Sequence, residues 1–182
     1  MKMKIGLFPL SAKPFHAGHF DVIRRAAAEN HEVFVFVSTS DRKKKNEFHV
    51  LGATMEDAWE NIICRVMPRN VHITYGGSPI RKVYEYLAAA SEEPDRGDTY
   101  TVYSDTHDIA KNFPIHSQIR YFKYLAFNNL VKFVGLERGV DTPDCSGTKM
   151  RGYLKARDFE SFSKYVPGGM DAEKYWNILI NG

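Results

Sequence analysis

A chain of 182 residues with 43% hydrophobic composition fits a single domain, residues 1–182, with a sizeable core. Its net charge of +3 is mild and its basic residues are concentrated in one run at positions 42–45, so we expect small anionic ligands rather than nucleic acid. No apolar run is long enough for a membrane span, the N-terminus lacks the apolar core of a signal peptide, and the two cysteines have no metal-ligand spacing. We therefore expect a cytoplasmic protein without a membrane partner.

The first part of the chain predicts a strand, a turn, a helix and a second strand. Met3–Pro9 is a short apolar segment typical of a buried strand, and apolar residues recur at helical spacing over Phe20–Glu29. Glu32–Ser38 is apolar without alternation, as expected for a parallel strand that is covered on both faces. This order indicates a strand–helix–strand unit.

The rest of the chain continues the same alternation. Further strands are expected over Val71–Tyr75, Thr99–Tyr103 and Val131–Val134, and helices over Ala53–Arg65, from Ser78 to about Ala90, around Ile109, near Tyr121 and from Ser146 to Lys155. Residues 91–98 are polar and predict a surface loop. These elements predict an α/β fold: one doubly wound, Rossmann-like domain with a mainly parallel five-stranded sheet, right-handed crossovers and a helical C-terminal part.

Two histidines and a glycine lie between the first strand and the first helix, in the run Lys13-Pro14-Phe15-His16-Ala17-Gly18-His19. In an open α/β sheet this junction lies at the carboxyl edge, where ligands bind and where the N–H groups of a helix start favour anions. Imidazoles can donate hydrogen bonds to phosphate oxygens and can carry a proton near neutral pH. Gly18 would allow a close approach of the backbone or of a nucleotide. The alternative is an ordinary turn with two solvated histidines.

A second polar motif opens the helical C-terminal part, in the run Cys145-Ser146-Gly147-Thr148-Lys149-Met150-Arg151. Ser146 is a typical N-cap residue, so Gly147 and Thr148 would lie in the first turn of a helix whose N–H groups favour an anion. The alternative is an ordinary helix cap followed by a solvated arginine.

Together the two motifs resemble the HxGH nucleotidyltransferase superfamily, which includes cytidylyltransferases, pantetheine-phosphate adenylyltransferases and nicotinamide-mononucleotide adenylyltransferases. The segment Pro14–His19 is most similar to the PFHxGH form of the nicotinamide-mononucleotide branch, and Cys145–Arg151 is similar to the I-S-[ST/G]-T-x-x-R motif, with Cys145 in place of isoleucine. Many relatives have a G-x-F-x-P run that leads straight into HxGH, whereas Gly6-Leu7-Phe8-Pro9 stands several residues earlier. The first loop is therefore expected to be longer here.

The resemblance implies a nucleotidyltransferase that moves a nucleoside monophosphate group, AMP from ATP in the favoured reading, to a small phosphorylated acceptor with release of pyrophosphate. Such a transfer requires two anions held in line and stabilisation of the charge that develops, more than a strong base. Mg²⁺ would accompany the triphosphate. The alternatives are a cytidylyltransferase that uses CTP and a non-catalytic nucleotide-binding regulator. A class I aminoacyl-tRNA synthetase, which has a similar histidine signature, requires a longer chain. Assembly as a homo-oligomer stays open.

The resemblance also implies roles for individual residues. His16 and His19 would face the triphosphate, with His19 at the α-phosphate, and Gly18 would lie against the nucleotide. Ser146, Gly147, Thr148 and Arg151 would hold the β- and γ-phosphates. Further phosphate or acceptor contacts are expected among Lys13, Arg42, Lys43, Lys44, Lys45 and Asp105. The basic run fits a solvated surface equally well, and Asp105 fits a helix cap equally well. No set of metal-ligating residues is predicted.

Overall fold

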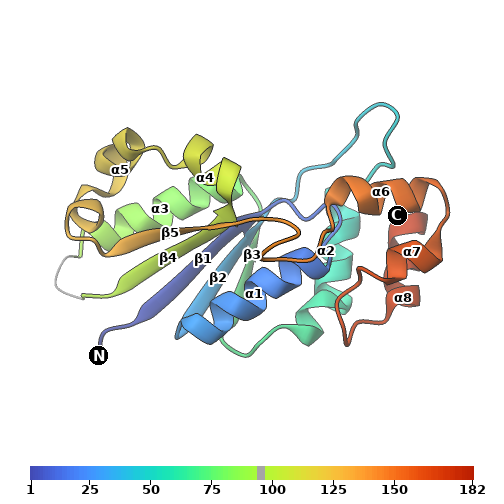
Figure 1. The fold of residues 1–182 in the computed structure, drawn as a ribbon, viewed down its shortest axis with the longest axis horizontal. Helices are drawn as coiled ribbons and strands as arrows, with labels where there is room; N and C mark the ends of the chain where they lie inside the picture. Colours follow the sequence, from blue (N-terminus) through green and yellow to red (C-terminus); the bar gives the residue numbers. More distant parts are fainter. Residues whose placement is uncertain (94–96) are drawn as a thin grey trace.

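A five-stranded parallel sheet forms the centre of the computed structural model, which describes residues 1–93 and 97–182 (Figure 1). Its strands are β1 (Lys4–Leu10), β2 (Glu32–Val37), β3 (Val71–Tyr75), β4 (Thr99–Asp105) and β5 (Val131–Leu136). They lie side by side in the order β3-β2-β1-β4-β5, and every pairing is parallel. The mainly parallel sheet and the single Rossmann-like domain expected from the sequence are confirmed.

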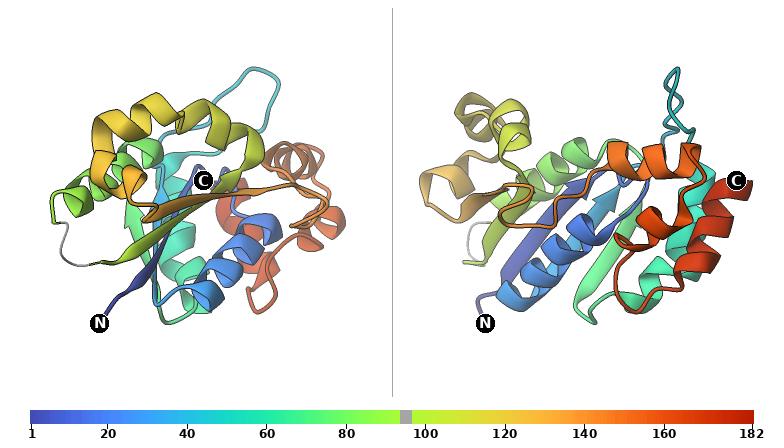
Figure 2. Two further views of the ribbon diagram at one scale, coloured as in Figure 1. Left: turned by 60° about the vertical axis from the view of Figure 1, so that its left-hand side comes forward. Right: turned by 45° about the vertical axis from the view of Figure 1, so that its right-hand side comes forward.

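Helices cover both faces of this sheet (Figure 2). Those of the described residues are α1 (Ala17–Glu29), α2 (Gly52–Asn61), the 3₁₀ turn η1 (Ile63–Val66), α3 (Pro79–Ser91), α4 (Thr106–Asn112), α5 (Ile115–Phe127), α6 (Gly147–Lys155), α7 (Phe159–Ser163) and α8 (Ala172–Asn181). One buried core joins the sheet to α1, α2 and the C-terminal helices, and a second core joins it to α3 and α5. The central strand β1 is buried over six consecutive residues because both cores cover it.

Two expected helix starts are confirmed by their caps. The Ser78 hydroxyl accepts a hydrogen bond from the Arg81 N–H at 3.4 Å, with Pro79 as the first helical residue of α3. The Ser146 hydroxyl accepts one from the Lys149 N–H at 3.1 Å and begins α6. Both helices therefore begin where short-range sequence signals place them.

One expected helix is shorter than predicted. The apolar pattern over residues 53–65 predicts a continuous helix, but α2 ends at Asn61 and only the 3₁₀ turn follows. Ile62 leaves the helical region, with φ −128° and ψ −55°, and both Ile62 and Ile63 are buried. Tertiary packing therefore outweighs the local pattern at this point.

The polar segment 91–98 lies partly outside the described residues, at positions 94–96. Ser91 is the last residue of α3, and residues 97 and 98 lead directly into β4. Within residues 1–93 and 97–182, no helix combines the length and the apolar character that a bilayer span requires.

The sheet opens between its two central strands at the carboxyl edge. β1 pairs with β2 as far as Leu10, but its pairing with β4 stops at Leu7 opposite Val102. Pro9, which follows, has no N–H to donate to a neighbouring strand. Because β4 continues along β5 to Asp105, β1 and β4 separate beyond this point. The order of the strands also reverses here, and ligands of open α/β folds bind at this position.

Candidate active site

A cleft of about 250 Å³ lies where β1 and β4 separate. The ends of β1 and β4 and the loop after β5 form its walls, and the start of α1 closes one side. Its polar and titratable lining includes His16, His19, Asp105, Asp108, Arg138 and Cys145. The HxGH motif and Cys145, the first residue of the second motif, therefore line one cleft, although they are more than a hundred positions apart in the chain.

His16 is the N-cap of α1, which is an unusual use of a histidine. Its Nδ1 accepts a hydrogen bond from the Gly18 N–H at 3.0 Å, and the side chain is buried. In return, the His16 N–H donates to Nδ1 of His19 at 3.2 Å, so the two residues form a reciprocal capping box. The imidazole rings stack with their centroids 3.8 Å apart.

These two hydrogen bonds fix the proton position on both rings. A ring nitrogen that accepts a backbone N–H carries no proton, so each neutral imidazole must carry its proton on Nε2. Among the described residues, neither Nε2 of His16 nor Nε2 of His19 has a hydrogen-bond partner. The cleft is therefore lined by two oriented N–H donors that are suited to anionic oxygens.

Both histidines are neutral near pH 7, in contrast to the expectation that either could carry a proton there. Burial, together with the nearby positive charge of Arg138, lowers the pKa of His16 to about 4. Burial lowers the pKa of His19 well below its ordinary value, and His16 and Arg138 lower it further. The positive charge of the cleft comes from Arg138, which has no carboxylate within 4.0 Å among the described residues.

The structure gives a reason for a glycine at position 18 that differs from the expected close approach of a nucleotide. A Cβ at this position would lie 2.8 Å from Cε1 and 3.0 Å from Nδ1 of His16, closer than real Cβ contacts allow. The glycine is therefore required for the His16 ring to fold over the start of α1. Gly18 also lines the cleft, so a nucleotide role stays a prediction.

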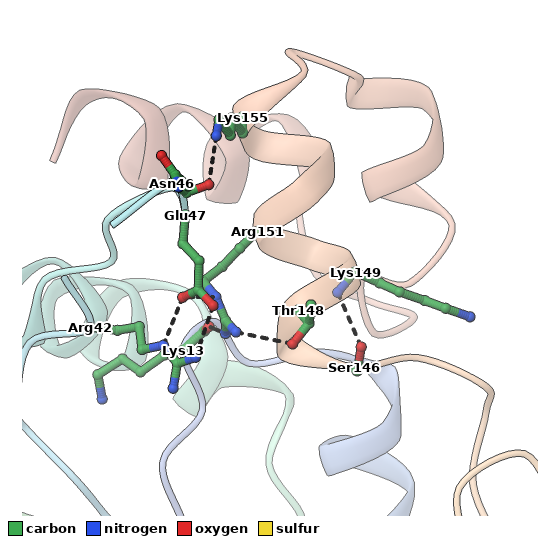
Figure 3. Close-up of polar contacts among 9 residues, drawn as sticks. All are labelled: Lys13, Arg42, Asn46, Glu47, Ser146, Thr148, Lys149, Arg151 and Lys155. Carbon is green, nitrogen blue, oxygen red and sulfur yellow. Dashed lines mark hydrogen bonds and ion pairs between the residues drawn. The ribbon is translucent and has the colours of Figure 1, made fainter. Parts of the chain in front are cut away.

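Arg151 does not line this cleft and belongs to a separate polar cluster (Figure 3). Its Nη1 donates to the Lys13 carbonyl at 2.7 Å and its Nη2 donates to the Thr148 hydroxyl at 3.2 Å. Its Nε lies 3.2 Å from Glu47 Oε2, but the two atoms are not aligned for a hydrogen bond. A Cβ at Gly147 would lie 2.7 Å from Arg151 Nη1, so that glycine makes room for the guanidinium. Arg151 is only 6% exposed, and the alternative of a solvated arginine is wrong.

The predicted basic contacts have different surroundings in the structure. The Lys13 ammonium is buried and donates to the carbonyls of Ser11 and Ser38 at 2.9 and 2.6 Å, and burial lowers its pKa to about 8. Arg42 makes two hydrogen bonds to Glu47, and Lys43 pairs with Asp41 at 3.2 Å. Lys44 and Lys45 are exposed. Within the run 42–45, Arg42 is the member that reaches the cluster around Arg151.

For Asp105 the expected helix cap is confirmed, and a contact with phosphate or acceptor stays a prediction. Its carboxylate accepts the His107 N–H at 2.9 Å and caps α4, and the residue also lines the cleft. Asp108, one turn further along α4, lines the cleft as well. In the described part of the chain, no three His, Cys, Asp or Glu side chains gather as a metal site.

The sequence analysis missed Asp108, Arg138 and Glu47. Arg138 follows the fifth strand, and its position directly after a strand end at the carboxyl edge is a signal that could have found it. Glu47 lies within a long polar segment after the second strand, and no local pattern singles it out. Only the tertiary contact with Arg151 identifies it.

Comparisons with known proteins agree with this fold. No protein-family model and no curated protein matches the chain. Among solved structures, it is similar to Plasmodium falciparum nicotinic acid mononucleotide adenylyltransferase complexed with NaAD, at 14% identity and a TM-score of 0.62, over 100% of this chain and 96% of that one. It also matches a bifunctional NMN adenylyltransferase/ADP ribose pyrophosphatase from Francisella tularensis, at 13% identity and a TM-score of 0.59, over 99% of this chain but only 50% of that one.

The chain has the fold of these adenylyltransferases. They are members of the superfamily that the two motifs resemble, so the resemblance is confirmed at the level of fold. Identities of 13 and 14% leave substrate and residue roles to be argued from the site itself.

Proposed function

We propose that this protein is a nucleotidyltransferase that moves AMP from ATP to a small phosphorylated acceptor and releases pyrophosphate. The observation that carries the proposal is the pair of neutral imidazoles that line the cleft at the carboxyl edge and carry their protons on Nε2. Two fixed N–H donors beside the charge of Arg138 suit a phosphate that gains negative charge during transfer. The shared fold supports the same reaction class.

In the proposed reaction, an oxygen of the acceptor phosphate attacks the α-phosphorus of ATP. A phosphoanhydride P–O–P link forms between the acceptor and AMP, the bond from the α-phosphorus to the oxygen that bridges to the β-phosphorus breaks, and pyrophosphate leaves with that electron pair. The acceptor phosphate is already largely ionised at pH 7, so no side chain has to remove a proton. His19 and His16 donate to the oxygens of the reacting phosphate and remain neutral throughout.

Mg²⁺ would neutralise part of the triphosphate charge during this reaction. Such an ion keeps several waters and takes one or two protein carboxylates, so the absence of a dedicated cage in the described residues is compatible with it. Asp105 and Asp108, which both line the cleft, fit as its protein ligands.

Nicotinate mononucleotide and nicotinamide mononucleotide are the first acceptors to test, because the similar structures are adenylyltransferases of those compounds. The experiment combines ATP or CTP with each of these acceptors, phosphopantetheine, glycerol 3-phosphate and phosphocholine, and detects pyrophosphate. We expect release with ATP and one of the mononucleotides. Release only with CTP would identify a cytidylyltransferase, and binding of ATP without turnover for every acceptor would identify a regulator.

A further inference from the structure

The arginine cluster has a carboxylate at its centre. Nε and Nη2 of Arg42 donate to the two oxygens of Glu47 at 2.9 and 3.0 Å, and Nε of Arg151 lies 3.2 Å from the same carboxylate (Figure 3). A carboxylate between two guanidiniums occupies the position that suits a phosphate group, because both anions accept the planar fork of arginine.

One carboxylate does not satisfy this cluster. Burial and the neighbouring Arg42 lower the pKa of Arg151, so the two positive charges disfavour each other and the single negative charge of Glu47 compensates only in part. The Nε–H of Arg151 is buried and has no hydrogen-bond partner. A buried donor without an acceptor costs free energy, and a group with more charge and more oxygens would remove that cost.

The segment that carries Glu47 lies along the middle and the end of α6. We call residues 38–51 the strap. Arg42 and Val50 exchange backbone hydrogen bonds of 2.8 and 3.0 Å and pair its two arms, and the Lys155 ammonium donates to the Asn46 carbonyl at 2.5 Å. Figure 1 shows the strap rising beside α6. The strap is thus fastened to α6 by two contacts, of which the Glu47–Arg151 pair is the ionic one.

Two segments of the chain, the start of α6 and the loop before α1, each contribute residues to both the cluster and the histidine cleft. Cys145, two residues before α6, lines the cleft, whereas Thr148 and Arg151, in the first two turns of α6, belong to the cluster. The carbonyl that anchors Arg151 belongs to Lys13, three residues before His16. A polyphosphate that begins at the histidines and follows the start of α6 would end at the two arginines.

We propose that Glu47 is an internal substitute for the terminal phosphate of the nucleoside triphosphate. Its carboxylate occupies the position between Arg42 and Arg151 until a bound triphosphate displaces it. This inference rests on the proposed function, because it requires a triphosphate whose α-phosphate lies at the histidines. Its consequence is selectivity by length and charge. A ligand that stops short of the cluster leaves the Glu47 ion pairs intact, and only a triphosphate exchanges one carboxylate for a more highly charged group.

Glu47→Gln tests the exchange, because the substitution keeps the shape of the side chain and removes its charge. The probe is inorganic tripolyphosphate, with affinity measured by calorimetry on the full chain. We expect binding about tenfold tighter than in the wild type, since the arginines no longer have to give up an ion pair. Asp144→Asn is the matched control: Asp144 also lies beside the start of α6 and pairs with Lys149 at 3.2 Å, but it does not contact Arg151. Its affinity should stay within about twofold of the wild type.

Unchanged or weaker tripolyphosphate binding by Glu47→Gln would overturn the proposal, because Glu47 would then be a support for the arginines. Equal tightening in Asp144→Asn would overturn it too, as an effect of net charge. A second measurement needs no variant: the carboxyl carbon signal of Glu47 in NMR should move when wild-type protein is saturated with tripolyphosphate, and a fixed signal contradicts displacement. If the wild type binds no tripolyphosphate, the proposed function fails as well. If it binds and transfers AMP while Glu47→Gln is not tighter, only this inference fails.

Discussion

The histidine cleft and the arginine cluster both present donors to an anion, but they are built in different ways. In the cleft, the donors are held by contacts two and three residues apart along the chain, and their Nε2–H groups have no partner among the described residues. In the cluster, Arg151 is held by the Lys13 carbonyl, 138 positions away, and its charge is balanced by Glu47 of the strap. The cleft is therefore set for a ligand by local structure, whereas the cluster must exchange a resident carboxylate. Variants of each part should affect different steps.

The largest effect is expected from His19→Ala. Loss of one fixed N–H donor to the α-phosphate should lower kcat by about two orders of magnitude. Tripolyphosphate affinity should change much less, because the arginine cluster is intact. Steady-state pyrophosphate release and calorimetry measure the two quantities, and His116→Ala, an exposed histidine on α5, is the control. Near-normal turnover would remove His19 from the reaction.

Arg151→Lys should mainly change tripolyphosphate affinity, whereas His19→Ala should mainly change kcat. Lysine keeps the charge but cannot reach the Lys13 carbonyl, the Thr148 hydroxyl and Glu47 at once, so tripolyphosphate affinity should fall about tenfold or more. Arg81→Lys, on the exposed side of α3, is the matched control. If affinity and transfer are both unchanged, Arg151 does not bind phosphate and the cluster is only structural.

Two glycine variants separate the regions most directly. In Gly18→Ala the new Cβ displaces the His16 ring, which should lower kcat and destabilise the fold by about 1 kcal/mol through loss of the α1 cap. In Gly147→Ala the new Cβ displaces Arg151 Nη1, which should weaken tripolyphosphate binding.

The control for both glycine variants is Gly152→Ala, which lies in α6 together with Gly147. A Cβ there has no heavy atom within 4 Å, so we expect a gain in stability of about 0.5 kcal/mol and no change in binding. Urea unfolding and calorimetry provide the readouts. Identical profiles for the Gly18 and Gly147 variants would contradict a division of labour between the two regions.

A pH dependence of stability is expected from the cleft alone. The pKa of His16 falls to about 4 on folding, below the ordinary value of 6.5, so the unfolded chain binds the proton first as the pH is lowered. Stability should therefore decrease between about pH 6.5 and pH 4, by up to about 1.4 kcal/mol per pH unit from His16. His16→Asn keeps an N-cap acceptor but does not titrate, and urea unfolding across this window should show a shallower slope. Equal slopes would mean that His16 is not buried as a neutral ring.

The sequence by itself determined the architecture and the local geometry of the site. Uninterrupted apolar strands that alternate with amphipathic helices predict a parallel sheet covered on both faces, and the structure confirms it. The spacing of His16, Gly18 and His19 already places two rings and a glycine in one helical turn. Ser146 likewise identifies the start of α6, because a serine cap acts on an N–H three residues away.

Only the tertiary structure decided which charged residues belong together. Four basic residues at positions 42–45 are alike in the sequence, but the tertiary structure places the guanidinium of Arg42 on the Glu47 carboxylate, which also pairs with Arg151. The protonation state of the two histidines could not be predicted from the local sequence either. Burial by distant elements and the charge of Arg138, after β5, lower their pKa values. Hydrogen bonds within a helical turn follow from residue spacing. Burial and ion pairs between segments a hundred residues apart depend on how the whole chain packs, and spacing carries no information about them.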